Sequence, residues 1–206
     1  MEVRTRLRDQ RQRLLLQWAH AGSEAAFRQL YRELCGPVMG YLAARIRPRE
    51  EAEDLCSQIF MRFLQRLDQY DGDRGSVLSW ILSMSRNALI DRLRSLRPTS
   101  SLDENFDAVD PSPDPLDRIV EGEEARFVHG VLANHPAELR ELYSLRFAHG
   151  LRYAEIGEML GISEAAVKQR FSRSLRELRS TLEQRNEKGG ANHADWKAQR
   201  NPQGSA

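Results

Sequence analysis

Cysteine is almost absent from this chain of 206 residues, which has only Cys35 and Cys56. Neither belongs to a CxxC pair or lies near a pair of histidines, so the sequence predicts no zinc site and no disulfide framework. Both fall within helical patterns and are expected to be small core residues. The five histidines are scattered without a ligand spacing. We therefore expect no metal site.

Features of an enzyme are also missing. The sequence has no phosphate-binding loop and no recognisable pair of nucleophile and base, so we expect neither catalysis nor a cofactor. No run approaches the roughly 20 apolar residues of a membrane span. The N-terminus, MEVRTRLRDQRQR, lacks the apolar stretch of a signal peptide. These absences predict a cytoplasmic protein without membrane insertion.

Sustained alternation of apolar and polar residues, which would predict β-strands, is missing as well. Apolar residues recur at helical spacing instead. In the N-terminal half, Ser23 is expected to cap one helix and Pro37 to open a second. A third helix is expected over about 50–67 and a fourth over about 77–96. The expected fold class is therefore all-α.

The near-zero net charge conceals an uneven distribution along the chain. The whole chain has a net charge of +1, but residues 1–97 hold 17 basic against 12 acidic residues, residues 98–124 hold 1 against 9, and residues 125–206 hold 13 against 9. The acidic middle contains PTSSLDENFDAVDPSPDP, which is rich in Pro, Ser and Asp and poor in periodic apolar residues. Such a composition is typical of a flexible linker.

The most informative pattern is YAEIGEMLGISEAAVKQRFSRSLRELRSTL, residues 153–182. Two helical patterns meet there at the turn formed by Gly161, Ile162 and Ser163, and Ser163 can cap the second helix. Gly157 in the first helix would permit a close helix crossing. A short helix, a tight turn with Gly and a longer helix are typical of helix-turn-helix DNA recognition.

The second helix of this motif has two different faces. Val167, Phe171, Leu175 and Leu178 recur at spacings of four, four and three, so they are expected to face the core. The opposite arc has no acid, and its long hydrogen-bond donors suit phosphates and base edges. The residues of this arc are Ala165, Lys168, Gln169, Ser172, Arg173, Arg176 and Arg179. The alternative is a surface helix with ordinary solvated charges.

Two small helical domains joined by the flexible acidic linker are therefore expected: an N-terminal four-helix bundle and a C-terminal helix-turn-helix domain. The second domain should open with a helix that holds Phe127, Val131 and Leu132, followed by one that starts at Pro136 and ends at Gly150. The expected parts are an N-terminal extension (1–20), the first domain (21–97), the linker (98–116), the second domain (117–185) and a disordered tail (186–206).

The expected helix over 77–96 also has two faces. Its predicted buried stripe is Leu78, Leu82, Ser85, Leu89 and Leu93. On the other side, Trp80 lies beside Asn87 and Arg94, and these side chains could stack on unpaired bases and hydrogen-bond to them. Packing of Trp80 and Met84 against a neighbouring helix is an equally supported alternative.

Three motifs together resemble the extracytoplasmic-function (ECF) sigma factors, the two-domain members of the bacterial primary sigma family. They are EAEDLCSQIFMRFLQRL, GDRGSVLSWILSMSRNALIDRLRSLR and, after the linker, GLRYAEIGEMLGISEAAVKQRFSRSLREL. They occur in the family's order and spacing, and the resemblance covers about residues 21–182. It implies a non-catalytic subunit that directs bacterial RNA polymerase to promoters. Members often have Gly-Thr where this chain has Ala165 and Ala166, so the promoter sequence does not follow from the resemblance.

The resemblance implies that the third helix binds core RNA polymerase, with its acids facing a basic surface of the polymerase clamp. The residues concerned are Glu51, Glu53, Asp54, Leu55, Gln58 and Arg62. Taken alone, these acids could equally complement the N-terminal dipole of their own helix.

Promoter-binding residues follow from the same resemblance. The loop Asp71–Ser76 would capture a flipped base of the minus-ten element, with Gly72 and Gly75 allowing close approach to DNA. The minus-ten residues would be Asp71, Arg74, Trp80, Arg86, Asn87, Asp91, Arg92 and Arg94. The minus-thirty-five residues would be Lys168, Gln169, Arg170, Ser172, Arg173 and Arg176. Arg170 flanks the apolar stripe and could instead serve phosphate or the core.

The partners implied are bacterial core RNA polymerase, promoter DNA and an anti-sigma factor, and the free protein is expected to be a monomer. Two other classes stay open. An autonomous helix-turn-helix regulator would be a dimer with a sensor domain, and the acidic third helix argues against it. An interaction protein that sequesters polymerase without reading DNA would tolerate alanine at Lys168 and Arg173.

Overall fold

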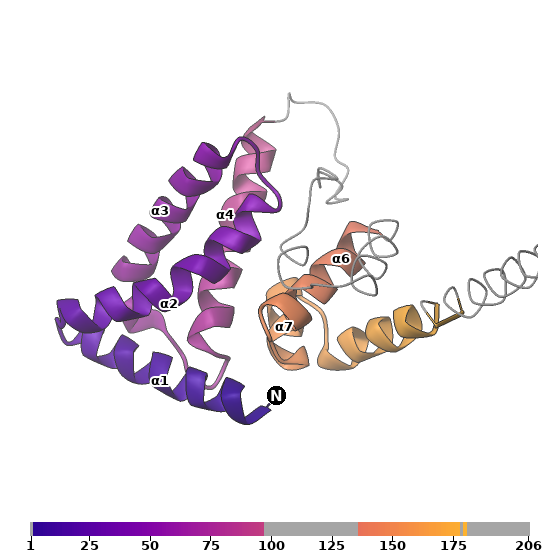
Figure 1. Ribbon diagram of the computed structural model, residues 1–206, viewed down its shortest axis with the longest axis horizontal. Helices are drawn as coiled ribbons and strands as arrows, with labels where there is room; N and C mark the ends of the chain where they lie inside the picture. The colour runs from indigo at the N-terminus through magenta and orange to yellow at the C-terminus, as the bar shows by residue number, and fades with distance from the viewer. Residues whose placement is uncertain (1, 97–135, 178, 181–206) are drawn as a thin grey trace, which may run out of the picture. The chain divides into compact units, whose positions relative to one another are not determined.

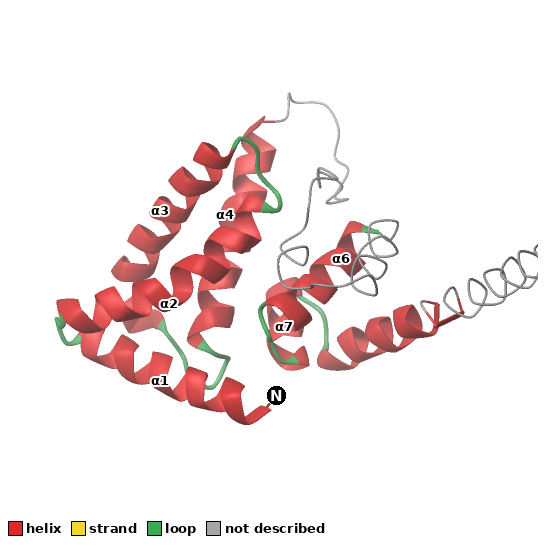
Figure 2. Ribbon diagram, viewed as in Figure 1, coloured by secondary structure: helices red, strands yellow, loops and turns green. Residues whose placement is uncertain are grey.

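The computed structural model describes residues 2–96, 136–177 and 179–180, and every regular element in these ranges is helical (Figure 2). The expected all-α class is confirmed. The chain divides into two compact units, residues 1–167 and 168–206, and each is described by itself. Across the described ranges, no helix has the length and apolar content needed to span a membrane.

Four helices form a bundle at the N-terminal end of the first unit (Figure 1). They are α1 (Glu2–His20), α2 (Glu24–Ala43), α3 (Arg49–Gln65) and α4 (Val77–Leu96). α2 packs against the other three. Its fully buried residues are Leu30, Leu34, Val38, Tyr41 and Leu42. Their spacing places them on one face of the helix, so apolar burial along this face holds the bundle together.

α2 is one helix, although the sequence predicted two helices separated at Pro37. Ser23 caps it as expected, because the Ser23 Oγ accepts a hydrogen bond from the backbone N–H of Ala26 at 3.3 Å. Pro37 lies inside the helix, where a proline costs about 3 kcal/mol. Leu34 and Val38 on either side are fully buried, and burial of each such side chain contributes about 1.5–3 kcal/mol. The helix therefore continues through the proline.

Residues 2–20 form α1, which belongs to the bundle and is not an extension ahead of it. α1 packs against α2 and α4, with Leu15, Leu16 and the polar Gln12 buried, whereas Leu14 and Trp18 on the same helix are exposed. The apolar residues of α1 thus do not mark its buried face, which is why their periodicity did not reveal it. α1 takes the place in the four-helix bundle that the sequence assigned to a separate second helix.

The other two bundle helices agree closely with the sequence pattern. α3 ends at Gln65 and a 3-10 turn, η1 (Leu67–Gln69), follows it. The expected buried residues of this region, Leu55, Ile59, Phe63 and Leu67, are all buried. In α4, Leu78, Leu82, Ser85 and Leu89 are buried, while Leu93 near its end is only half-buried.

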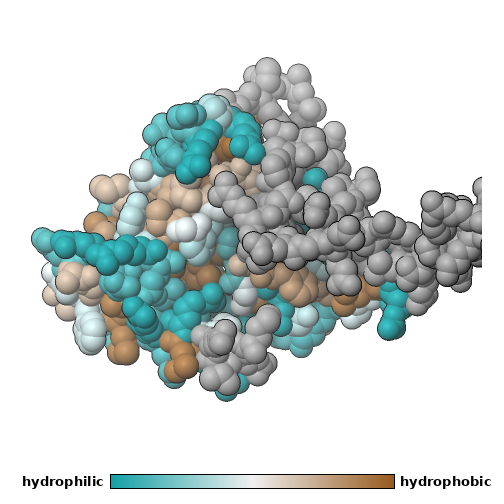
Figure 3. Space-filling view, in the orientation of Figure 1, coloured by the Kyte–Doolittle hydropathy of each residue, from teal (hydrophilic) through white to brown (hydrophobic). Residues whose placement is uncertain are grey.

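Not every large apolar side chain is covered. Figure 3 shows hydrophobic residues among hydrophilic ones on the face in view. Exposed examples from the bundle are Trp18, Tyr31, Met61 and Leu64. Exposed apolar residues among polar neighbours are common on folded proteins.

The first unit continues with three short elements: α6 (Ala137–Tyr143), the π-helical segment η3 (Ser144–Ala148) and α7 (Tyr153–Leu160). As expected, Pro136 immediately precedes the first of these helices. Gly150 lies between η3 and α7 with φ of 71°, a backbone conformation that glycine adopts without steric cost. The expected helix with Phe127, Val131 and Leu132, the linker and the C-terminal tail lie outside the described residues.

The predicted helix-turn-helix is present in the backbone. α7 ends at Gly161, which has φ of 69°, and residues 164–177 are helical after the turn. Ser163 caps this second helix, because its Oγ accepts a hydrogen bond from the backbone N–H of Ala166 at 3.1 Å. A Cβ added at Gly157 would lie 2.7 Å from the carbonyl oxygen of Ile162. Gly157 therefore allows the turn to fold back closely on α7, as expected.

We expect Gly157→Ala to lower the free energy of unfolding by about 1–3 kcal/mol, because the added methyl group forces backbone to move in a packed turn. Gly40→Ala is the matched control. Gly40 lies within α2 with nothing within 4 Å of an added Cβ, and alanine is favoured over glycine in a helix by about 1 kcal/mol. Urea unfolding of both variants measures the difference, and equal stability would contradict the close approach at Gly157.

Candidate nucleic-acid interface

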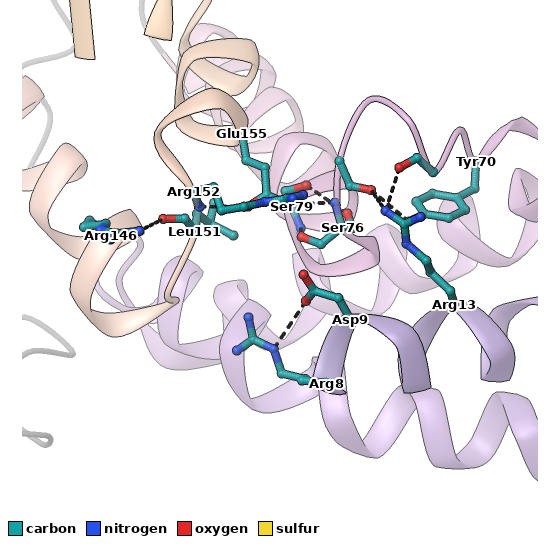
Figure 4. A network of polar contacts seen from close by, with 12 residues as sticks. Arg8, Asp9, Arg13, Tyr70, Ser76, Ser79, Arg146, Leu151, Arg152 and Glu155 are labelled. Carbon is teal, nitrogen blue, oxygen red and sulfur yellow. Dashed lines mark hydrogen bonds and ion pairs between the residues drawn. The ribbon is translucent and has the colours of Figure 1, made fainter. Parts of the chain in front are cut away.

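The loop Asp71–Ser76 is held by hydrogen bonds from two directions. From α1, the Arg13 guanidinium donates to the carbonyl oxygens of Gly72 at 2.6 Å and Gly75 at 3.3 Å (Figure 4). The Tyr70 hydroxyl donates to the same Gly75 oxygen at 2.8 Å. The first helix therefore positions the loop in which the sequence predicted base capture, and Arg13 is a residue that the sequence reasoning missed.

The two glycines of this loop lie close to side chains of the protein itself. A Cβ at Gly72 would lie 2.9 Å from Arg13 Nη1, and a Cβ at Gly75 would lie 2.6 Å from Ser79 Oγ. Close approach to DNA was the role predicted for both glycines. The contacts provide a second reason for glycine, since larger residues would displace the side chain of Arg13 or of Ser79.

A buried carboxylate lies beside the start of α4. Glu155 of α7 is 4% exposed; its Oε1 accepts from the Ser76 backbone N–H at 2.8 Å and from the Arg152 side chain at 3.1 Å, and its Oε2 accepts from the Arg152 backbone N–H at 2.8 Å. Burial alone would raise the pKa of Glu155. The hydrogen bonds from Arg152 and Ser76 outweigh burial and hold this pKa at about 2, so the group is a carboxylate at neutral pH.

Asp9 of α1 belongs to the same polar network (Figure 4), with one carboxylate oxygen 3.8 Å from Arg8 Nε. Burial and the nearby charge of Glu155 raise the pKa of Asp9, while Arg8, Arg152 and Arg13 lower it. Burial and repulsion are the larger influences, so the network favours a negative charge on Glu155 more strongly than on Asp9.

The predicted minus-ten residues of α4 differ in exposure. Asn87, Asp91, Arg92 and Arg94 are exposed. The Arg86 side chain is 22% exposed, and its Nε lies 3.5 Å from Glu141 Oε1 of α6. Glu141 also accepts a hydrogen bond from the Tyr41 hydroxyl at 2.7 Å. In the loop, Asp71 and Arg74 are exposed, and Arg74 forms an ion pair with Glu158 of α7.

Trp80 packs within the bundle instead of presenting an open face. Its ring centroid lies 5.2 Å from that of Phe63 and 5.5 Å from that of Tyr70. The side chain is half-buried. Of the two alternatives that the sequence left open, the structure favours packing against a neighbouring helix.

The predicted polymerase-binding residues lie on α3, with one exception. Glu53, Asp54, Gln58 and Arg62 are exposed, and Glu51 is half-buried. Leu55, however, is 7% exposed and belongs to the core. Leu55 cannot contribute a surface contact while the bundle is intact, because its position on α3 places it on the same face as the buried Ile59.

Two ion pairs involve the acids of this α3 surface. Arg49 Nε lies 2.8 Å from Glu53, one turn further along the helix. Arg92 of α4 lies 3.2 Å from Glu51. The predicted polymerase-binding surface and the predicted minus-ten surface are therefore linked through Glu51 and Arg92.

The second helix of the helix-turn-helix presents its predicted donors to solvent. Lys168, Gln169, Arg170, Ser172, Arg173 and Arg176 are all exposed. Arg170 is therefore not a core residue. The buried positions of this helix are Val167, Phe171 and Ser174, while Leu175 is 53% exposed. The predicted apolar stripe is thus wrong at Leu175, because the buried face continues through the small residue Ser174.

The solvent-facing donors of this helix also make local contacts. Arg173 Nε lies 3.1 Å from Glu177, and Arg176 Nε donates to the carbonyl oxygen of Ser172 at 3.2 Å. Such exposed pairs contribute little to stability, so both guanidinium groups can exchange these contacts for a nucleic acid.

Two family descriptions match the chain: Sigma-70 region 2 over residues 30–99 and Sigma-70, region 4 over residues 136–178. The ECF RNA polymerase sigma factor SigK of Mycobacterium ulcerans is 30% identical over 172 residues, covering 82% of this chain and 92% of SigK. The chain belongs to the ECF sigma factor family. It is therefore a transcription initiation factor and not an enzyme.

Other relatives are similar over the same extent of this ECF sigma factor. The "Probable RNA polymerase sigma factor RfaY" of Xanthomonas campestris pv. campestris is 32% identical over 81% of this chain and 43% of RfaY. The ECF RNA polymerase sigma factor BldN of Streptomyces coelicolor is 30% identical over 82% of this chain and 64% of BldN. The chain thus spans less than two thirds of these two relatives.

Solved structures of similar fold include two complexes. CnrH in complex with the cytosolic domain of CnrY matches with a TM-score of 0.57 and 22% identity, over 84% of this chain and 97% of that one. The sigma factor RpoE in complex with the anti-sigma factor NepR from Bartonella quintana matches with a TM-score of 0.53 and 18% identity, over 76% and 96%. These similarities support the helical fold of this ECF sigma factor.

The sequence reasoning missed the acids of α6 and α7 that contact the bundle. Glu155 had a detectable signal, because it lies three residues after Arg152 at the start of a helix, the spacing of a capping box, and its side chain does accept from the backbone N–H of Arg152. Nothing in the sequence indicated that Glu155 also accepts from Ser76, which is 79 residues away.

We expect His149 to make the free energy of unfolding depend on pH. Burial lowers the pKa of His149 from 6.5 to about 4, with smaller contributions from Arg45 and Arg8. The folded protein therefore binds a proton there less readily than the unfolded chain. Stability should fall as the pH decreases from 6.5 toward 4, by about 2 kcal/mol between pH 6.5 and pH 5. Urea unfolding at the two pH values measures the loss.

The matched variant is His149→Gln, which cannot gain a proton. Its loss of stability over the same interval should be smaller by about the same 2 kcal/mol. Glu155 does not interfere, because its depressed pKa means that its stabilisation is lost only as the pH falls below the ordinary value of 4.5 toward 2. An identical pH dependence in both proteins would contradict the assignment to His149.

Proposed function

We propose that this ECF sigma factor binds core RNA polymerase through α3, reads the minus-thirty-five element through helix 164–177 and captures melted minus-ten DNA through the loop Asp71–Ser76 and α4. The observation that carries the proposal is the two-faced helix 164–177. All six of its predicted DNA-binding residues are exposed, while Val167, Phe171 and Ser174 are buried.

Minus-thirty-five recognition follows from the chemistry of the exposed face. Lys168, Arg173 and Arg176 are positively charged donors that suit phosphate oxygens and guanine edges, and Gln169 can pair with adenine. Recognition helices of this class enter the major groove with their N-terminal residues nearest the bases. Lys168 and Gln169 lie closer to the capped start at Ser163, so they are the better candidates for base contacts, and Arg176 for phosphate.

Minus-ten capture is assigned to the loop and to the exposed part of α4. Asn87, Arg92 and Arg94 offer donors for bases and phosphates of a single strand, and the loop next to Tyr70 is the part predicted to hold a flipped base. Trp80 supports this surface from beneath by packing on Phe63 and Tyr70. Binding of unpaired bases then supplies the free energy for opening the duplex, without nucleotide hydrolysis.

Polymerase binding is assigned to the exposed part of α3. Glu53 and Asp54 provide negative charge, and Gln58 and Arg62 lie one and two turns further along the same helix. Exposed acids of the free protein lose little solvation free energy when they bind a basic partner. They stay solvated on one side and can form ion pairs in the complex. The protein would act in the cytoplasm, where the polymerase transcribes.

A regulatory partner is also part of the proposal. CnrH and RpoE were solved with the cytosolic domain of CnrY and with the anti-sigma factor NepR. By analogy, we assign an anti-sigma factor to this protein as its negative regulator.

Run-off transcription with purified bacterial core polymerase and a pool of genomic promoter fragments tests the function. The protein should produce initiation at defined start sites that requires both components. Lys168→Ala combined with Arg173→Ala should lower promoter-specific transcription by about 30-fold or more, because each base or phosphate contact contributes about 1–3 kcal/mol. Core binding should stay unchanged.

Arg32→Ala is the matched control for this pair, because Arg32 is an exposed arginine on α2 that lies outside the predicted surfaces. It should transcribe like the unaltered protein. Tight binding to a palindromic duplex without polymerase, together with no binding to core, would contradict the proposal and indicate an autonomous regulator.

Charge reversal at Asp54 tests the α3 surface. Asp54→Lys should weaken binding to core polymerase at least about tenfold, since a new positive charge would face a basic partner. Asp68→Lys makes the same change at an exposed site on η1 and should have little effect. Fluorescence titration of labelled protein with core measures both affinities. Equal weakening by the two variants would point to net charge and not to α3.

A further inference from the structure

We propose that three glutamates of α6 and α7 hold the minus-ten surface in the free protein, so that promoter DNA and these acids compete for the same groups. The proposal rests on the minus-ten assignment above and concerns its regulation. The glutamates are Glu141, Glu155 and Glu158, and all their contacts lie within the first unit, residues 1–167.

Glu155 contacts the end of the base-capture loop. Its carboxylate accepts the Ser76 backbone N–H at 2.8 Å, immediately before α4 begins at Val77. Backbone N–H groups at the start of a helix favour a negative partner. Glu155 thus supplies an anion to a loop that a nucleic acid would approach with its phosphates.

Glu141 contacts the minus-ten helix. Its Oε1 lies 3.5 Å from Arg86 Nε, and the two side chains are 6% and 22% exposed. The Tyr41 hydroxyl donates to the same oxygen at 2.7 Å. Arg86 is therefore turned toward an acidic partner in the interior and is less available to DNA than its exposed neighbours Asn87 and Arg94.

Glu158 contacts Arg74, the cation of the loop. The Arg74 Nε donates to Glu158 Oε1 at 3.1 Å, and a second guanidinium nitrogen contacts the same oxygen. Both side chains are largely exposed. An exposed pair of this kind adds little stability, but it neutralises Arg74 while it lasts.

The three contacts have one common property. In each, a carboxylate binds a donor group that could instead bind a phosphate oxygen. Guanidinium and backbone N–H groups bind either anion, but a group paired with a glutamate is not free for DNA. The free protein is therefore distributed between a closed form with these contacts and an open form without them. Its apparent affinity for DNA is reduced in proportion to the closed fraction.

Glu141→Gln combined with Glu158→Gln tests the proposal. Both changes keep the side-chain size and remove the charge that pairs with Arg86 and Arg74. Glu155 is left intact because it also caps α7. Glu24→Gln combined with Asp68→Asn is the matched control, since it removes the same net charge from exposed positions of α2 and η1.

The first measurement is hydrogen exchange of the free, full-length protein, without polymerase or DNA. The Ser76 amide is hydrogen-bonded to Glu155 in the closed form. Its peptide should exchange about fivefold faster in the double variant than in the unaltered protein and the control. Equal exchange in all three proteins would overturn the proposal.

The second measurement is fluorescence anisotropy of a labelled single-stranded oligonucleotide from a start site mapped by run-off transcription. The double variant should bind this DNA about tenfold more tightly than the control. Adding Arg86→Ala to the double variant should remove most of the gain. Faster hydrogen exchange of the Ser76 peptide without tighter DNA binding would contradict the proposed competition between the glutamates and DNA.

The two proposals fail separately. An unaltered protein that does not initiate transcription with core polymerase overturns the proposed function. An unaltered protein that initiates transcription, but binds the oligonucleotide as tightly as the double variant, overturns only the competition between glutamates and DNA.

Discussion

The carboxylate of Glu155 joins the start of α7 to the residue that immediately precedes α4. A charge buried to this degree would be costly unless its hydrogen-bonding capacity were satisfied. Three donors from Ser76 and Arg152 meet that requirement, and they lower its pKa to about 2 despite burial. The same carboxylate caps α7 and lies at the start of α4. The geometry of the loop Asp71–Ser76 therefore depends on a residue of the helix-turn-helix.

The structure also explains how one small protein can keep the surfaces proposed for polymerase and for DNA separate. α2 packs against the other three helices of the bundle, so α3 and α4 each need to bury only one face. Their outer faces remain polar, with Glu53 and Asp54 on α3 and Asn87 and Arg94 on α4. The Glu51–Arg92 pair links these two faces at 3.2 Å. A rigid bundle of this kind would fix the distance between the proposed polymerase surface and the proposed DNA surface.

Predictions from local patterns were correct where a feature depends only on contacts within one helix or turn. Ser23 and Ser163 cap helices because a hydroxyl beside the first turn needs no distant partner, and Gly157 acts within its own turn. The sequence was misleading where burial depends on other helices. Pro37 did not end α2, because Leu34 and Val38 are buried on both sides of it. Leu55 has the spacing of a core residue, and its assignment to the polymerase surface came from the family motif. Gln12 and Ser174 are buried although they are polar, and Leu175 is exposed although it is apolar.

By itself, the sequence determined the all-α class, the helix-turn-helix with its capped, cation-bearing second helix, and membership of the ECF sigma factors. These features depend on periodicity, capping and short motifs, all of which act over a few residues. Only the tertiary structure decided that α1 completes the bundle, that Arg13 holds the loop Asp71–Ser76 and that Glu141, Glu155 and Glu158 contact the proposed minus-ten surface. The contacts of Arg13, Glu155 and Glu158 join residues 59 to 84 positions apart. Their formation depends on how the helices pack, and no local pattern in the chain encodes it.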